Sequence, residues 1–303
     1  MDASTDPGTG MRPVKYEFSG KIGYAPTLFL ALVILMFAIP SYLYGLVSAG
    51  IMYMKLKILI MVCVGMGLGW ATAWLGQKFR SRSIVWVTLM ALIGTAVGVY
   101  VGVAVFMETI FATGGGPVPP QFQTPAMIAD PFLWWFRLKT INGAGYYSRS
   151  TYSTSAVSGW ELWIDWGFEL VCFCGGAIGV AFVTIRSKAY CEDCGKWLEL
   201  KKSALRFVPP VDKAVRKRLE AGDLAPILDM PIRGTKAAAA GAHFRLDYVL
   251  CKECGNMGTY RIISVTPGAK NPESNISSLM LLTPDAAPIL GLLLESDKPG
   301  GAL

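Results

Sequence analysis

The sequence predicts a membrane α-helical protein, in which a bundle of four transmembrane helices precedes a small α+β domain. Two observations predict this class. Hydrophobic residues make up 53% of the 303 residues and charged residues only 16%, whereas soluble proteins carry about 25% charged residues. Four long apolar runs lie before residue 187, and after it the density of charged residues becomes that of an ordinary soluble domain. This change in composition places the main domain boundary near residue 186.

Each apolar run is long enough to cross a membrane as one helix. A helix rises about 1.5 Å per residue, so about 20 apolar residues cross a hydrocarbon core of about 30 Å. The runs lack the alternation of polar and apolar residues that marks membrane-spanning β-strands. The first run is too long for the apolar part of a cleaved signal peptide, so we interpret it as a membrane anchor. The four predicted spans are Pro26–Val47, Ile58–Gly76, Ile84–Met107 and Trp166–Ile185.

Basic residues predict that both termini are cytoplasmic. Lys78, Arg80 and Arg82 separate the second and third runs without an acidic residue. The side of a membrane with the denser Lys and Arg is the cytoplasmic side. Lys55 and Lys57, in the short loop on the opposite side, weaken this contrast without reversing it. We therefore expect a multi-pass protein of a membrane such as the bacterial inner membrane, with both termini in the cytoplasm.

This orientation assigns a side to the remaining segments. Residues 1–25 are expected to form a cytoplasmic N-terminal tail, residues 187–266 a cytoplasmic domain and residues 267–303 a C-terminal tail. The transmembrane domain then covers residues 26–186, with a long outer loop at residues 108–165.

Aromatic residues gather in and after that outer loop. Trp160, Trp163 and Trp166 are three residues apart, so they stay near one face of a helix. Their position is typical of an aromatic belt at the level of the lipid headgroups. Alternatively, they form a surface for docking another membrane subunit.

Small residues recur at every fourth position in two of the predicted spans, where they would let neighbouring helix backbones approach closely. They are Gly65 and Gly69 in the second span, and Gly94, Gly98 and Gly102 in the third. Two interpretations remain open, which are close packing within one four-helix bundle and formation of a homo-oligomer through the third span.

Three acidic residues, Glu161, Asp165 and Glu169, are spaced to form a stripe on one face of the fourth predicted helix. Acidic residues in a membrane helix are costly and are candidates for an ion or proton pathway. No deeper position in any span is charged, which favours structural pairing with a basic residue of the outer loop, for example Arg137 or Lys139.

Two CxxCG motifs predict a metal site in the C-terminal domain. A CxxC turn lets two thiolates face one point, and the following glycine, Gly195 or Gly255, accepts the positive φ that closes the turn. Four thiolates form a closed tetrahedral site, which is the pattern of structural rather than catalytic zinc. The predicted ligands are Cys191, Cys194, Cys251 and Cys254.

The sequence around these motifs predicts short strands. Apolar residues alternate with polar ones over residues 243–250, as in a half-buried strand, and residues 260–265 resemble its return strand. A strand, a CxxCG turn and a second strand resemble the zinc-ribbon or rubredoxin-like fold group, over residues 189–200 and 243–266. A long insertion between the two motifs, with a helix expected near Val211–Glu220, departs from a compact ribbon. Such a resemblance implies a fold and fixes no function.

The identity of the metal stays open between two candidates. We expect Zn²⁺ as a structural ion, while iron in a rubredoxin-type site uses the same four ligands. A thioredoxin-type redox pair has one CxxC motif in a βαβ setting, which does not fit two motifs with glycines. Disulfides are not expected in a cytoplasmic domain.

The sequence contains one histidine, His243, and no catalytic constellation that stands out. We therefore expect a non-enzymatic integral membrane subunit or scaffold, whose zinc domain docks partner proteins. An oligomeric channel or transporter with an acidic outer vestibule is the alternative, and a membrane enzyme or redox protein a third. The expected partners are the lipid bilayer and other membrane subunits or further copies of this chain. The basic helix of the insertion is expected to face water or anionic lipid rather than nucleic acid.

Overall fold

The computed structural model describes residues 14–51, 54–113, 117–147, 156–198, 201–231, 241–254, 257–269, 272–283 and 287–291. The chain divides into two compact units. One unit is Ser19–Arg186, and the other combines the chain up to Phe18 with the chain from Ser187 onward. Gly255 and the end of the C-terminal tail lie outside the described residues.

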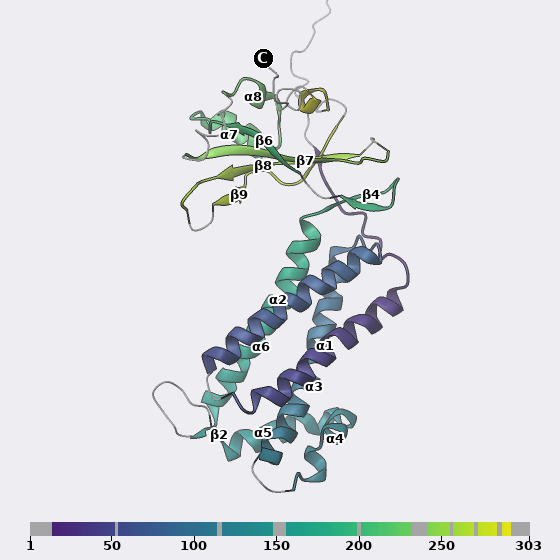
Figure 1. Ribbon diagram of the computed structural model, residues 1–303, viewed down its shortest axis with the longest axis vertical. Helices are drawn as coiled ribbons and strands as arrows, with labels where there is room; N and C mark the ends of the chain where they lie inside the picture. Colours follow the sequence, from purple (N-terminus) through teal and green to yellow (C-terminus); the bar gives the residue numbers. More distant parts are fainter. Residues whose placement is uncertain are drawn as a thin grey trace, which may run out of the picture. The chain divides into compact units, whose positions relative to one another are not determined.

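The first unit is helical, and four of its helices are long and apolar enough to cross a membrane. They are α1 (Pro26–Ser48), α2 (Met54–Lys78), α3 (Ile84–Thr113) and α6 (Trp160–Arg186). Figure 1 shows them side by side as a bundle. The four predicted spans lie within these helices, and three of the helices extend well beyond them. Backbone hydrogen bonds continue through polar residues at a helix end, so the apolar run does not mark where the helix stops.

The extension of α2 changes the position of two lysines. The sequence suggested that Lys55 and Lys57 lie in a short loop, but the structure places both in the first turn of α2. Lys57 is only 8% exposed. It therefore belongs to the interior of the helical unit rather than to a loop.

Close contacts at glycines pair the four helices. On α2, a Cβ at Gly65 would lie 2.6 Å from the backbone oxygen of Phe173 in α6. On α3, a Cβ at Gly98 would lie 2.7 Å from the Oγ of Ser41 in α1. A Cβ at Gly69 or Gly94 would make a similarly close contact with α6 or α1, and one at Gly102 would lie 3.2 Å from the backbone oxygen of Ser41 in α1. The structure thus uses these glycine faces within one chain, which is the first of the two interpretations above.

The predicted outer loop contains further helices. These elements are a 3₁₀ turn η1 (Pro120–Phe122), α4 (Thr124–Ala129), α5 (Pro131–Ala144) and a two-stranded pair of β2 (Tyr146–Tyr147) and β3 (Ala156–Val157). Phe132 and Phe136 of α5 are exposed. Trp135 of α5 packs against Trp163 of α6, with ring centroids 5.0 Å apart. Of the three predicted belt tryptophans, Trp160 is exposed, while Trp163 and Trp166 are half-buried.

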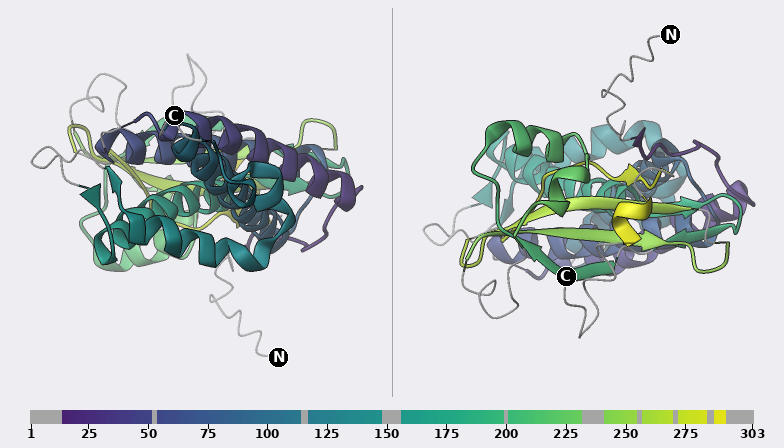
Figure 2. Two further views of the ribbon diagram at one scale, coloured as in Figure 1. Left: turned by 90° about the horizontal axis from the view of Figure 1, so that it is seen from below. Right: turned by 90° about the horizontal axis from the view of Figure 1, so that it is seen from above.

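The second unit is built on a six-stranded sheet in the order β1-β10-β8-β7-β6, with β9 also paired to β8. Strands β7 and β8 pair over eight residues and run side by side through this unit (Figure 1 and Figure 2). A separate hairpin of β4 and β5 lies between α6 and β6 in the chain. The strands are β1 (Val14–Lys15), β4 (Ala189–Cys191), β5 (Lys196–Leu198), β6 (Lys201–Phe207), β7 (His243–Leu250), β8 (Gly258–Val265), β9 (Glu273–Asn275) and β10 (Met280–Leu281).

One face of the sheet packs against α7 (Lys213–Glu220) and α8 (Ala225–Leu228). The side chain of Asp212 caps α7 by accepting a hydrogen bond from the backbone N–H of Ala214 at 2.8 Å. Tyr260, buried in this core, donates a hydrogen bond to the carbonyl oxygen of Gly222 at 2.7 Å. Burial raises the pKa of Tyr260 to about 12, so its hydroxyl remains a donor at neutral pH.

The other face of β7 is also buried, which differs from the half-buried strand expected from its alternation. Arg245 and Asp247 form an ion pair at 2.7 Å, and Arg245 also pairs with Glu273 at 2.9 Å. Arg261 of β8 adds a contact to Asp247 at 3.4 Å. Because these charges neutralise one another, polar side chains can be buried where the pattern alone predicts exposure.

The N-terminal strand β1 is part of this sheet rather than a separate tail. Val14 pairs with Leu281, and Lys15 with Met280. The residues just before the first helix and those near the end of the chain therefore share one sheet. If all four apolar helices cross a membrane, both segments lie on the same side, as this pairing requires.

Glycine substitutions on α2 test the helix pairing. Gly65→Ala is expected to lower the stability of the helical unit by about 1–3 kcal/mol, because its Cβ would overlap the backbone of α6. Gly67→Ala, on the open face of the same helix, is expected to be neutral or slightly stabilising, because alanine is the better helix former. Thermal unfolding of the two variants in mild detergent measures the difference. Equal melting temperatures would contradict the pairing.

Candidate metal centre and membrane cavity

The four cysteines of the CxxCG motifs come together in one cluster. Their sulfur atoms all lie within 4.8 Å of one another. The sulfurs of Cys191 and Cys254 are 3.6 Å apart, and those of Cys194 and Cys251 are 3.5 Å apart. Sulfur atoms around a tetrahedral ion with metal–sulfur distances of about 2.3 Å are about 3.8 Å apart. The cluster is therefore consistent with a metal-binding site.

Two tight turns position these cysteines. Cys191 ends β4, and the N–H of Gly195 donates to its carbonyl oxygen at 2.9 Å. Gly195 has a φ of 64°, as its place after the CxxC motif predicts. Cys251 follows β7, and its N–H donates to the carbonyl oxygen of Met257 at 2.8 Å. Each turn thus presents two sulfurs from a hydrogen-bonded backbone.

The local electrostatics suit a group of metal ligands. Hydrogen bonds from the backbone N–H groups of Cys254 and Glu253 lower the pKa of Cys251 to about 6. Burial raises the pKa of Cys191, and hydrogen bonds with Cys254 and Cys251 raise that of Cys194. One thiolate is therefore favoured at neutral pH, while further thiolates would repel it in the absence of a cation. A divalent metal ion removes that repulsion and deprotonates its ligands.

Contacts from three parts of the chain surround the cluster. Ala189, Leu198 and Val249 pack around the cysteines in a small apolar core. Tyr16, which follows β1, joins this core, and its hydroxyl accepts a hydrogen bond from the N–H of Tyr190 at 3.0 Å. Lys196 and Glu253 form an exposed ion pair between the two turns. No pattern in the sequence indicates this role of Tyr16, since it lies 175 residues before Cys191.

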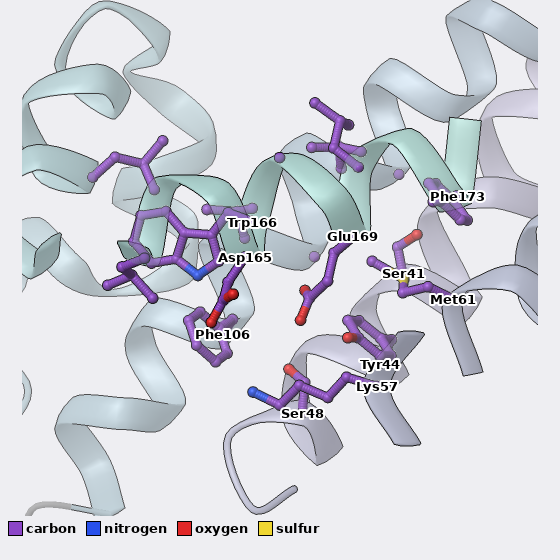
Figure 3. A pocket seen from close by; sticks show the side chains of 18 of the residues that line it. Ser41, Tyr44, Ser48, Lys57, Met61, Phe106, Asp165, Trp166, Glu169 and Phe173 are labelled. Carbon is purple, nitrogen blue, oxygen red and sulfur yellow. The ribbon is translucent and has the colours of Figure 1, made fainter. Parts of the chain in front are cut away.

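A second candidate site lies in the helical unit, where a cavity of about 320 Å³ is lined by α1, α2, α3, α5 and α6. Asp165 and Glu169 of α6 line it, together with Lys57 of α2 (Figure 3). Glu161 is exposed and is not among the lining residues. The structure therefore brings two of the three predicted acidic residues into one site and leaves the third outside it.

Lys57 is the basic residue that faces these carboxylates, in place of the Arg137 or Lys139 suggested by the sequence. It interacts electrostatically with both Asp165 and Glu169. Arg137 instead donates to the carbonyl oxygen of Ala126 at 3.4 Å, and Lys139 lies 5.4 Å from the ring centroid of Trp135. The signal in the sequence that could have identified Lys57 is its position directly before the apolar run that begins at Ile58, where a helix can continue outward to include it.

No protein-family model, curated protein or solved structure matches this chain.

Removing one cysteine tests the metal centre. Cys251→Ser is expected to abolish stoichiometric metal binding and to unfold the sheet-containing unit, because metal-binding energy contributes directly to folding in such sites. Elemental analysis and limited proteolysis of the full chain would measure both effects. Cys63→Ser, which changes an exposed cysteine of α2, is the matched control and should leave both unchanged. Full metal content in Cys251→Ser would contradict the assignment.

Proposed function

We propose that this chain is a non-enzymatic integral membrane subunit or scaffold, whose zinc-binding domain lies in the cytoplasm and docks partner proteins. The single observation that carries the proposal is the closed cysteine cluster. Four thiolates fill a tetrahedral coordination sphere and leave no position for a substrate or water, which is the arrangement of structural rather than catalytic sites.

Zinc is the metal we propose for this cluster. The ligand set also suits iron, but a cytoplasmic zinc site needs no redox partner and keeps its geometry unchanged. The resemblance to the zinc-ribbon fold group supports the same choice. An absorbance spectrum separates the two metals, because iron coordinated by four thiolates absorbs visible light and zinc does not.

The cytoplasmic location follows from the distribution of basic residues under the positive-inside rule. It is compatible with four free cysteines in the cluster, since cytoplasmic thiols remain reduced. Labelling of single introduced cysteines from either side of intact membranes would test it.

Partner docking is tested by purification in mild detergent. We expect specific proteins to co-purify with the wild-type chain and with Cys63→Ser, but not with Cys251→Ser, because only the last loses the domain that binds them. Partners identified by mass spectrometry should return when purified wild-type protein is added. A chain that purifies alone as a monomer would remove the support for a scaffold.

A channel or transporter is the second candidate, because the cavity contains charged side chains within the helical unit. Protein in liposomes would then conduct ions or protons, and Glu169→Gln would reduce that flux severalfold, since the glutamate lines the cavity. Glu161→Gln, on the exposed part of the same helix, should leave the flux unchanged. Equal flux in both variants would show that Glu169 has no role in conduction and would leave the channel or transporter function without support.

A further inference from the structure

The cavity in the helical unit has the size of a small-molecule site. Its volume of about 320 Å³ lies at the lower end of the range for ligand pockets, about 300–1,000 Å³. It lies between the two close helix pairs, α1 with α3 and α2 with α6. Protein atoms do not fill this space, so a ligand can occupy it without displacing a helix.

The charges in the cavity favour a cation. Lys57, Asp165 and Glu169 all line it, and their ionised forms carry a net charge of minus one. Figure 3 shows the two carboxylates projecting from α6 toward the side of the cavity that holds Lys57. One lysine compensates one carboxylate, and the second carboxylate remains costly in an apolar surrounding unless it takes up a proton or another cation approaches. A ligand with one positive charge would complete the balance.

The apolar walls favour an organic cation over a metal ion. Trp134, Trp163 and Trp166 line the cavity together with Phe106. The Lys57 ammonium already lies 5.6 Å from the ring centroid of Phe106, which shows that the aromatic wall receives a cation. Tryptophan faces bind substituted ammonium groups through their negative quadrupole, whereas a hydrated metal ion requires oxygen ligands around its whole sphere.

We propose that this cavity binds a hydrophobic organic monocation, in which a substituted ammonium group is joined to an apolar body. The ammonium group lies beside Asp165 and Glu169, and the apolar body lies against the tryptophans. This site is separate from the metal centre, and its occupation does not depend on the scaffold function or on transport.

Calorimetric titration of the full metal-loaded chain in a neutral maltoside detergent tests the charge requirement. The probe is benzoylcholine, which combines a quaternary ammonium group, an ester and a phenyl ring. Its control is 3,3-dimethylbutyl benzoate, a neutral molecule of the same shape. We expect the cation to bind at least about tenfold more tightly than the neutral analogue. Equal affinity, or no binding of the cation, would overturn the proposal.

Variants that change the charge in opposite directions test the site. Glu169→Gln keeps the shape of the side chain and should weaken benzoylcholine binding on the order of tenfold. Lys57→Met removes the competing cation and should strengthen it. Glu161→Gln, outside the cavity, removes a charge that acts on Asp165 only from a distance and should have a much smaller effect. The melting temperatures show whether each variant is folded. The opposite pattern, with weaker binding in Lys57→Met and no loss in Glu169→Gln, would mean that the cavity selects anions.

The same chemistry occurs in soluble amines and in the headgroups of aminolipids. Adding phosphatidylethanolamine to the micelles distinguishes them. If phosphatidylethanolamine displaces benzoylcholine, the occupant is a lipid headgroup. If it does not displace benzoylcholine, the occupant is a soluble amphiphilic amine. Both results support recognition of an organic cation, and phosphatidylglycerol serves as the anionic control that should not compete.

Discussion

The close approach of helix backbones at glycine positions is the constraint on which the helical unit depends. Helices in a bilayer gain little from hydrophobic association, so dispersion contacts between close backbones must hold them together. Gly65 and Gly69 bring α2 against α6, and Gly94 and Gly98 bring α3 against α1. The cavity lies between the two pairs, and Gly98 and Gly102 of α3 line it beside larger side chains such as that of Lys57. Glycines that hold α3 against α1 thus also form part of the cavity wall.

Two features of the sequence were sufficient to predict a large part of the structure. Hydrophobic length located four helices, since a bilayer sets the number of residues that a span requires. Paired CxxCG motifs located the cysteine cluster, because the chemistry of a tetrahedral site requires that residue type at that spacing. The apolar runs are local signals, and the CxxCG motif is recognisable because it occurs twice. Neither signal requires knowledge of how distant segments of the chain contact one another.

The remaining features depend on contacts between distant segments. Lys57 was assigned to a loop because an apolar window ends at a charged residue, although the helix continues through it. Arg245 and Asp247 were expected on an exposed face, but a partner from β9 allows their burial. Nothing near Val14 indicates that it pairs with Leu281. These pairings cannot be predicted from a single sequence, since the residues next to each partner contain no pattern that indicates a distant contact.

The pairing of β1 with β10 has a consequence for biosynthesis. During translation, β1 is made before the four apolar helices, whereas its partner strand β10 is made after them. The N-terminal strand must therefore wait, and β10 would remain an open sheet edge if the chain failed to return to the side on which it started. This small sheet can therefore form only in a chain that has made an even number of crossings. A chain with an odd number of crossings would expose an unpaired strand, which is a feature that cellular quality control can recognise.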